Sequence, residues 1–417
     1  MIKSTLYLKT DRSFKIFIYI FILHSFYCNC ESKLNNILLF YKGTNYRGGS
    51  FATNRNGDIV IEYSSRLRRL FYGFKKDGSY FFNSTDYENI PSKIIDIDVK
   101  INATRFESRN LFIQTKNGNN KEYLLSTGTF SSTELMDLEN NKYMVFNTTI
   151  MMGYTIFSKT FTLLDLNTYS QKEYVCIFTN KEDYNIKLIK FSFTDLKEYN
   201  IIKETKLENN YAFIRIVSSF VMNSNIVVFY INNNYECSFN LYDFDLNLIS
   251  NNSFIGEQID YNRYKNNLGY YFYEAGLFFK GILIQNNLVA FAYYKDCEYL
   301  IIKIGNFKKD NNNYFFEILF NIDLYEYHFQ ATVTLNDLSK INDNRFILIT
   351  STPDYKILYI LLFDLYNNYE NIKIRIYNIN LKKYKIIKEL SSVIYNGFVI
   401  FSSTVLDLEN ANIKKKN

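Results

Sequence analysis

The chain has 417 residues, of which 47% are hydrophobic and 18% aromatic, so it has enough apolar material for a large core and is not intrinsically disordered. Its formal net charge is +6 at pH 7, but the excess lies in the first thirty residues and in the lysines at 414–416, which leaves residues 31–413 neutral on balance. We therefore expect no nucleic-acid partner, because phosphate binding requires a basic surface.

The first thirty residues have the pattern of a secretory signal peptide. A basic stretch ending at Lys15 is followed by an apolar run over residues 16–23 and by small or polar residues up to Cys30. The run is shorter than the roughly 20 residues of a transmembrane helix, so we expect it to be removed and the mature chain to have no transmembrane segment. An uncleaved anchor is the alternative. The predicted parts are a signal peptide (1–30), one folded domain (31–413) and a basic tail (414–417).

The folded domain begins with an apolar run at residues 36–41 and a glycine-rich loop at 42–50. A phosphate-binding loop would need a helix after its glycines, and here a strand pattern follows, so we interpret the loop as turns that enter the first sheet. Apolar and polar residues then alternate over 57–63 and 70–74, with a turn at 75–78.

The same strand–turn–strand unit recurs along the rest of the chain. Hairpins are predicted within residues 112–125, 174–193, 226–244, 288–304 and 346–365. Several units contain a similar phrase in which an Asp follows apolar residues, as at Asp137, Asp243 and Asp364.

Units repeated at intervals of roughly 50–60 residues are typical of a β-propeller. We predict an all-β protein with a single propeller of six or seven blades, in which residues 36–41 supply a strand that the final unit at 391–408 lacks. The alternative is two successive β-sandwiches of about 190 residues each. Over residues 36–408 the pattern resembles extracellular β-propellers in general. No signature of a particular propeller family is present, so the resemblance implies the architecture alone.

Two features are better explained by structure than by chemistry. The Asp residues at 243 and 245 resemble the start of a calcium loop, but Leu248 replaces the required glycine, which favours a strand with one solvated face. His328 is the one histidine after the predicted signal, so the sequence predicts no zinc site and no serine triad. We expect neither a metal nor a cofactor.

The cysteines at 176, 237 and 297 recur at nearly equal intervals. Equivalent positions in neighbouring blades lie too far apart for a disulfide, which needs Cα atoms within about 7 Å, so free buried thiols are predicted.

The sequence favours a secreted, endomembrane or cell-surface interaction module that binds a protein or a glycan through one propeller face. Loop residues suited to such binding are Thr44, Asn45, Tyr46, Arg47 and Tyr235. Candidates for N-glycosylation are the sequon residues Asn83, Asn102, Asn147 and Asn251. The alternative function is a propeller-type hydrolase or lyase that uses carboxylates converging at the channel mouth. Two further alternatives are a structural coat protein and part of a membrane-anchored ectodomain.

Overall fold

The structure is a computed structural model in which every described element is a β-strand. It describes residues 18–22, 37–40, 47–64, 69–75, 80–83, 108–118, 120–128, 133–138, 142–146, 162–166, 172–180, 185–196, 198–207, 217–231, 237–253, 279–295, 299–310, 313–324, 337–351, 357–366, 369–380, 384–395 and 398–407. No helix among these residues is long and apolar enough to cross a membrane.

The described strands form seven four-stranded antiparallel sheets. Three sheets come first along the chain: β3 (Arg47–Thr53), β4 (Ile59–Ser64), β5 (Arg69–Phe74) and β6 (Tyr80–Asn83); β7 (Ser108–Gln114), β8 (Glu122–Gly128), β9 (Thr133–Asp137) and β10 (Lys142–Phe146); and β11 (Thr162–Asp165), β12 (Tyr174–Thr179), β13 (Ile186–Phe193) and β14 (Tyr199–Leu207). Three follow: β15 (Val217–Met222), β16 (Asn225–Ile231), β17 (Cys237–Asp243) and β18 (Leu248–Ser253); β19 (Phe279–Gln285), β20 (Leu288–Lys295), β21 (Tyr299–Asp310) and β22 (Asn313–Asp323); and β23 (Asp337–Asn342), β24 (Arg345–Ser351), β25 (Ile357–Tyr366) and β26 (Asn371–Asn380).

The remaining sheet joins the two ends of the chain. Its strands are β1 (Ile18–Ile22), β2 (Ile37–Phe40), β27 (Tyr384–Tyr395) and β28 (Phe398–Asp407), in the order β2-β1-β28-β27. The expectation that residues 36–41 complete the last unit is confirmed in part, because β2 belongs to this sheet. A further strand, β1, which lies within the predicted signal peptide, is placed between β2 and β28.

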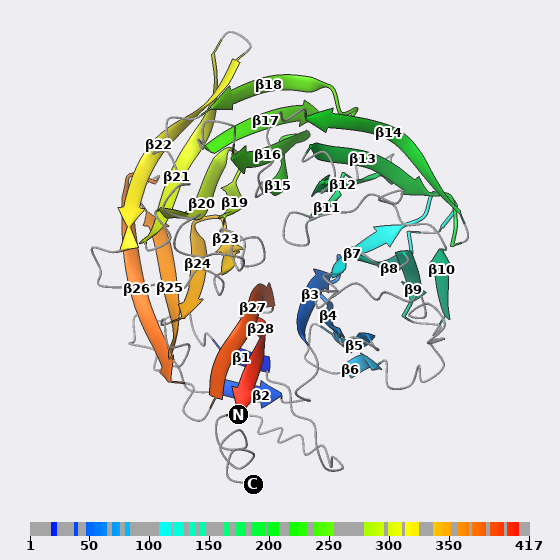
Figure 1. The fold of residues 1–417 in the computed structure, drawn as a ribbon, viewed down its shortest axis with the longest axis horizontal. Coiled ribbons are helices and arrows are strands. Elements are labelled where there is room, and N and C mark those ends of the chain that lie inside the picture. Colours follow the sequence, from blue (N-terminus) through cyan, green and yellow to red (C-terminus); the bar gives the residue numbers. More distant parts are fainter. Residues whose placement is uncertain are drawn as a thin grey trace.

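The sheets are arranged in a ring with their first strands innermost (Figure 1). The innermost strands of neighbouring sheets contact one another all the way round the ring. The contacts run in the order β3, β7, β11, β15, β19, β23 and β27, and β27 contacts β3. The chain therefore folds as a β-propeller, as predicted, and not as two β-sandwiches. The sequence predicts six or seven blades; the strand pairing gives seven sheets, of which the five from β7 to β26 form the continuous arc in Figure 1.

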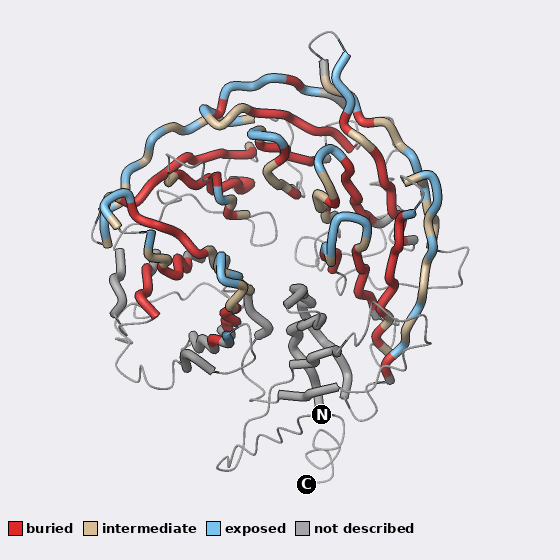
Figure 2. Tube along the Cα trace, turned by 180° about the vertical axis from the view of Figure 1, so that it is seen from behind, coloured by how far each residue is buried: buried red, intermediate tan, exposed pale blue. Residues whose placement is uncertain are grey.

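The apolar core is divided among the junctions between neighbouring sheets. Five clusters of buried residues each draw on two adjacent sheets, from the β3–β6 and β7–β10 pair to the β19–β22 and β23–β26 pair. Figure 2 shows the result as a band of buried middle strands with exposed residues along the outer strands. In the β11–β14 sheet both faces are buried, so every residue of β12 and β13 is buried, including the polar side chains of β13.

Phe229 in β16 lies at the centre of one such junction. Its ring contacts Phe239 in its own sheet and Phe291, Phe307 and Phe316 in the next, with centroid separations of 5.7–6.4 Å. Several of these pairs are edge-to-face or tilted, the geometry that the aromatic quadrupole favours. This aromatic cluster joins the β15–β18 sheet to the β19–β22 sheet.

The hairpins predicted from sequence are confirmed as antiparallel pairs, from β4–β5 to β24–β25. The glycine-rich segment also enters the first sheet, as expected. Gly48 already belongs to β3, and a bulge lies between Gly48 and Phe51. Residues 41–46 lie outside the described part of the chain.

Truncating Phe229 to alanine should destabilise the ring by about 3–5 kcal/mol, because the lost ring leaves a cavity in a junction that cannot collapse around it. Phe315→Ala is the matched control, since Phe315 is 42% exposed. Thermal unfolding of both variants checks this prediction. Equal shifts in the two melting temperatures would contradict it.

The pairing of β1 with β28 makes a second prediction. A chain that begins at residue 31 lacks β1, so it should unfold at a lower temperature than the chain that includes residues 1–30, because β28 loses its neighbour. Melting curves of the two chains, together with N-terminal sequencing of the secreted protein, are the measurements. Equal melting temperatures would show that β1 does not hold the ring closed. Cleavage of residues 1–30 as a signal peptide requires this outcome, because β1 would be removed with them.

Candidate functional site

One end of the ring is formed by tight polar turns, and we call it the turn face. Because neighbouring strands are antiparallel, the connection between the first and second strands of a sheet lies at the same end as the connection between its third and fourth strands. The turn face includes the turns at residues 54–58, 115–121, 223–224, 286–287 and 343–344. Three of these turns contain asparagines with positive φ, at Asn120, Asn223 and Asn286.

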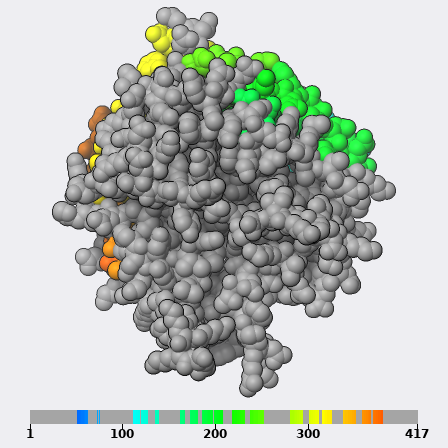
Figure 3. Space-filling model, viewed as in Figure 1, coloured from blue at the N-terminus to red at the C-terminus, as the bar shows by residue number. Residues whose placement is uncertain are grey.

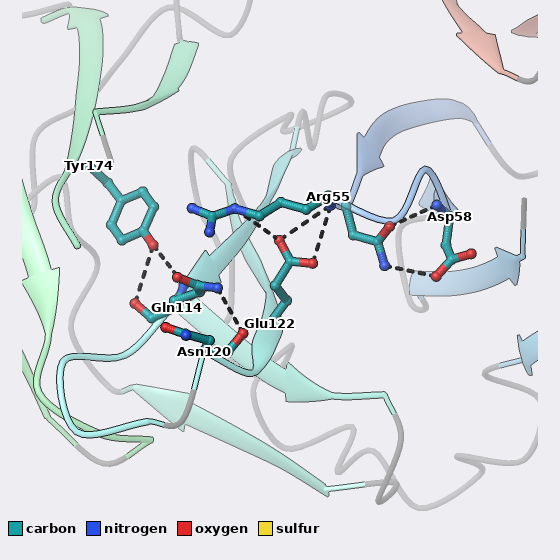
Figure 4. Close-up of polar contacts among 7 residues, drawn as sticks. Arg55, Asp58, Gln114, Asn120, Glu122 and Tyr174 are labelled. Atoms are coloured by element: carbon teal, nitrogen blue, oxygen red, sulfur yellow. Dashed lines mark hydrogen bonds and ion pairs between the residues drawn. The ribbon is translucent and has the colours of Figure 1, made fainter. Parts of the chain in front are cut away.

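The β3–β4 turn presents Arg55 to the neighbouring sheet (Figure 4). The Asn54 side chain donates to the Asp58 carboxylate at 2.9 Å, and its carbonyl oxygen accepts from the Asp58 amide at 2.7 Å. Gly57 adopts φ 84°, a conformation that a side chain would strain. These contacts fix the turn, and with it the backbone N–H of Arg55.

Glu122, the first residue of β8, faces that turn. Its carboxylate accepts a hydrogen bond from the backbone N–H of Arg55 at 3.2 Å and lies 3.8 Å from the guanidinium Nε. The Arg55 side chain is 54% exposed and that of Glu122 only 16%. The pair therefore joins the β3–β6 and β7–β10 sheets and leaves guanidinium donors open to solvent.

The electrostatics of Glu122 are governed first by burial. Burial raises the pKa of Glu122 above its usual value, although Arg55 opposes the shift, and the negative charges of Asp165 and Asp58 add to it. Three carboxylates from three successive sheets thus act on one another at the turn face. The described residues contain no group of three or more His, Cys, Asp or Glu placed to hold a metal ion.

Tyr174 occupies the corresponding place at the start of β12. Its hydroxyl accepts from the Gln114 amide at 2.6 Å and donates to the Gln114 carbonyl at 3.2 Å. The Gln114 side chain in turn donates to the Asn120 carbonyl at 2.7 Å, and Lys172 donates to the carbonyls of Thr115 and Gly118 at 2.9 Å. The β7–β8 turn that carries Glu122 is therefore held in place by the next sheet (Figure 4).

Lys190 makes a similar link one junction further along. It is almost fully buried and contacts Glu173 at 2.6 Å within its own sheet and Asp245 at 3.1 Å in the β17–β18 turn. Burial alone would lower the pKa of Lys190, but the hydrogen bonds and charges of Glu173 and Asp245 outweigh it, so the pKa lies above the usual value.

The acidic turn that resembles a calcium loop is closed by its own hydrogen bonds. The Asp243 carboxylate accepts from the backbone amides of Asp245 and Asn247 and from the Asn247 side chain, at 2.8–2.9 Å. Slight burial alone would raise the pKa of Asp243, but the hydrogen bonds from these donors outweigh it and lower the pKa. The carboxylate holds the turn, in which Leu246 adopts φ 57° and is buried.

Cys176 and Cys237 are free and buried, in agreement with the sequence prediction, whereas Cys297 lies outside the described residues. Burial raises the pKa of both thiols, that of Cys237 to about 12 despite the opposing charge of Lys303. A thiol with such a pKa is not a nucleophile near neutral pH.

Of the five binding residues predicted from sequence, the structure describes only Arg47, and of that only the backbone. Thr44, Asn45, Tyr46 and Tyr235 lie outside the described residues, and of Arg47 the structure describes the backbone, which pairs with Ser64.

Sequence reasoning missed Arg55, Glu122 and Tyr174. A Glu-Tyr pair occurs at both 122–123 and 173–174, but Glu122 is the first residue of β8 whereas Glu173 precedes β12, so the pair does not mark equivalent positions.

Neither a protein-family model nor a curated protein matches the sequence. Among solved structures, a fungal lectin with a six-bladed propeller from Aleuria aurantia is similar at 7% identity and a TM-score of 0.43, covering 81% of this chain and 96% of that one. An ulvan lyase of polysaccharide lyase family PL25 has 8% identity and a TM-score of 0.49, covering 89% and 98%. The WD40 domain of SCAP from fission yeast has 7% identity and a TM-score of 0.40, covering 85% and 94%. At these values no site residue can be transferred to this chain.

Replacing Lys190 with methionine should lower stability by about 2 kcal/mol at neutral pH, because the nearly buried carboxylate of Glu173 loses the ammonium group that lies 2.6 Å from it. Lys308→Met is the control, since the Lys308–Glu317 pair has the same 2.6 Å separation but is exposed, and such pairs contribute about 0.5 kcal/mol.

A raised lysine pKa stabilises the fold below the unfolded-state pKa, and this contribution is lost as the pH rises through the folded-state pKa. The difference between wild type and Lys190→Met should therefore shrink at strongly alkaline pH. Denaturant titrations of the three proteins across the pH range are the check. A constant difference would contradict the assignment of charge to Lys190.

Proposed function

We propose that the protein is a secreted or surface-exposed interaction module that binds a glycan on the turn face, at the junction between the β3–β6 and β7–β10 sheets. The observation that carries the proposal is the Arg55–Glu122 pair. A guanidinium that donates and a carboxylate that accepts match a pair of neighbouring sugar hydroxyls, each of which can do both.

The rigidity of the site supports binding. The β3–β4 turn is closed by Asn54 and Asp58, and the β7–β8 turn is held by Tyr174 and Lys172. Groups that are fixed before the ligand arrives lose little conformational entropy on binding. Backbone contacts of the β7–β8 turn with the β13–β14 sheet edge, from the amides of Lys116 and Asn117, add to this order.

Catalysis by the same carboxylates is the alternative function. A glycosidase needs two carboxyl groups on opposite sides of the scissile bond, one of them a free acid. At the turn face Asp58 is held by Asn54, and Glu122 accepts from the backbone of Arg55, so both act as fixed hydrogen-bond acceptors. This arrangement favours recognition over turnover.

Binding of the purified chain to an array of glycans, followed by titration of the best ligand, tests the proposal. Glu122→Gln and Arg55→Ala should each weaken binding about tenfold, because each removes one charged hydrogen-bonding group, worth roughly 1.4 kcal/mol. Asp343→Asn is the matched control: this exposed carboxylate lies in the β23–β24 turn of the same face and pairs with Lys340. Its affinity should equal that of the wild type.

The pH dependence is a second arm of the same test. Since the pKa of Glu122 is raised, affinity should fall as the medium is acidified, beginning at a higher pH than for an ordinary glutamate, and Glu122→Gln should remove this dependence. Absence of any glycan ligand, or wild-type affinity in Glu122→Gln, would reject the site. Release of shorter products from a polysaccharide would favour the hydrolase or lyase alternative.

A further inference from the structure

The outer strand β18 exposes apolar side chains, and among the described strands its outer edge pairs with none. It is the last strand of its sheet, and Leu248 and Ile249 are 51% and 40% exposed. The strand lies on the periphery of the ring, where Figure 3 shows the described atoms of the green segments at the surface. An open strand edge with exposed apolar residues is a site at which copies of a protein can pair, and natural proteins protect such edges.

Part of that protection is visible in the backbone. The register of β18 against β17 shifts beside Ile249, which interrupts the regular ladder at the most apolar point. Further along, Ser250 is buried and accepts a hydrogen bond from the Tyr314 amide of the next sheet at 3.3 Å. Ser250 therefore faces inward, while Ile249 and Asn251 on either side of it face the solvent.

Asn251 begins the sequon Asn251-Asn252-Ser253. Its side chain is exposed and lies two residues from Ile249, a separation of about 7 Å along a strand. Of the other sequon residues, Asn83 ends β6 and its side chain is not among those described, and Asn102 and Asn147 lie outside the described residues.

We infer that Asn251 is N-glycosylated and that its glycan covers the apolar edge of β18. In this step the Asn251 side-chain amide nitrogen bonds to C1 of an oligosaccharide carried on a lipid pyrophosphate; the bond from C1 to the pyrophosphate breaks, and the amide loses one proton. A bulky hydrophilic group two residues from Ile249 blocks the approach of another strand. The inference rests on the secretory location proposed above.

Expression of the full chain in a eukaryotic cell with a secretory pathway tests the inference. Asn251→Gln and Ser253→Ala should each lose the mass of one glycan that an amidase specific for N-glycans removes. Asn252→Gln is the matched control, because it changes the adjacent residue and keeps the sequon, so its mass after the amidase should match that of similarly treated wild type apart from the substitution.

A second measurement reads the role of the glycan. Asn251→Gln should self-associate at lower concentration than Asn252→Gln in light scattering, and adding Ile249→Lys should reverse this. A chain that is secreted but has the same glycan mass in wild type and Asn251→Gln overturns the inference and leaves the location intact. A chain retained in the cytosol overturns both. Loss of the glycan without any change in association overturns the covering role.

Discussion

Packing between neighbouring sheets is the interaction on which the rest of this propeller depends. Each of the five clusters described above combines residues from two adjacent sheets, and Phe229, whose ring contacts aromatic side chains in both of its sheets, is the clearest case. Because each sheet buries both faces, it is stable only while both neighbours are present. The ring is thus a cooperative object, and a cavity at one junction weakens the junctions on either side.

Polar contacts at the turn face also join neighbouring sheets, through hydrogen bonds and ion pairs. Three side chains each contact a neighbouring sheet. Glu122 contacts the β3–β4 turn, Tyr174 contacts the end of β7, and Lys190 contacts the β17–β18 turn. These contacts keep adjacent sheets in register where apolar packing ends and water begins. The same contacts hold donors and acceptors in fixed positions, so the groups that lock the ring together are also those best placed to recognise a ligand.

The middle strands of the sheets could be predicted from the sequence, whereas the edge strands could not. β12 and β13 are buried along their whole length, and the apolar run of β12 and the alternating apolar residues of β13 flank a turn that can be recognised from sequence. β14 alternates intermediate and exposed residues in the sequence YNIIKETKL, and β18 reads LISNNS, so neither has the contrast that a pattern search needs.

The candidate site was still harder to foresee, because it is made by residues from different sheets. Arg55 and Glu122 are 67 residues apart, and nothing near either one indicates the other. The contact depends on how far each turn projects from its strand, which varies from sheet to sheet. The Asp residue that ends a third strand was recognised as part of a repeat, and at Asp243 the structure supplies the reason, since the carboxylate closes the turn that follows.

The closing sheet imposes an order on synthesis. β1 and β2 precede every other described strand in synthesis, yet β28, the strand that pairs with β1, is the last described strand in the chain. At translation rates of about 5–20 residues per second, the N-terminal strands wait roughly 20–80 s for their partner. During that time a growing arc of sheets has two open ends, and its strands can pair with another nascent chain instead. The yield of this protein in a cell therefore depends on what protects β1 and β2 from other strands until β28 has been synthesised.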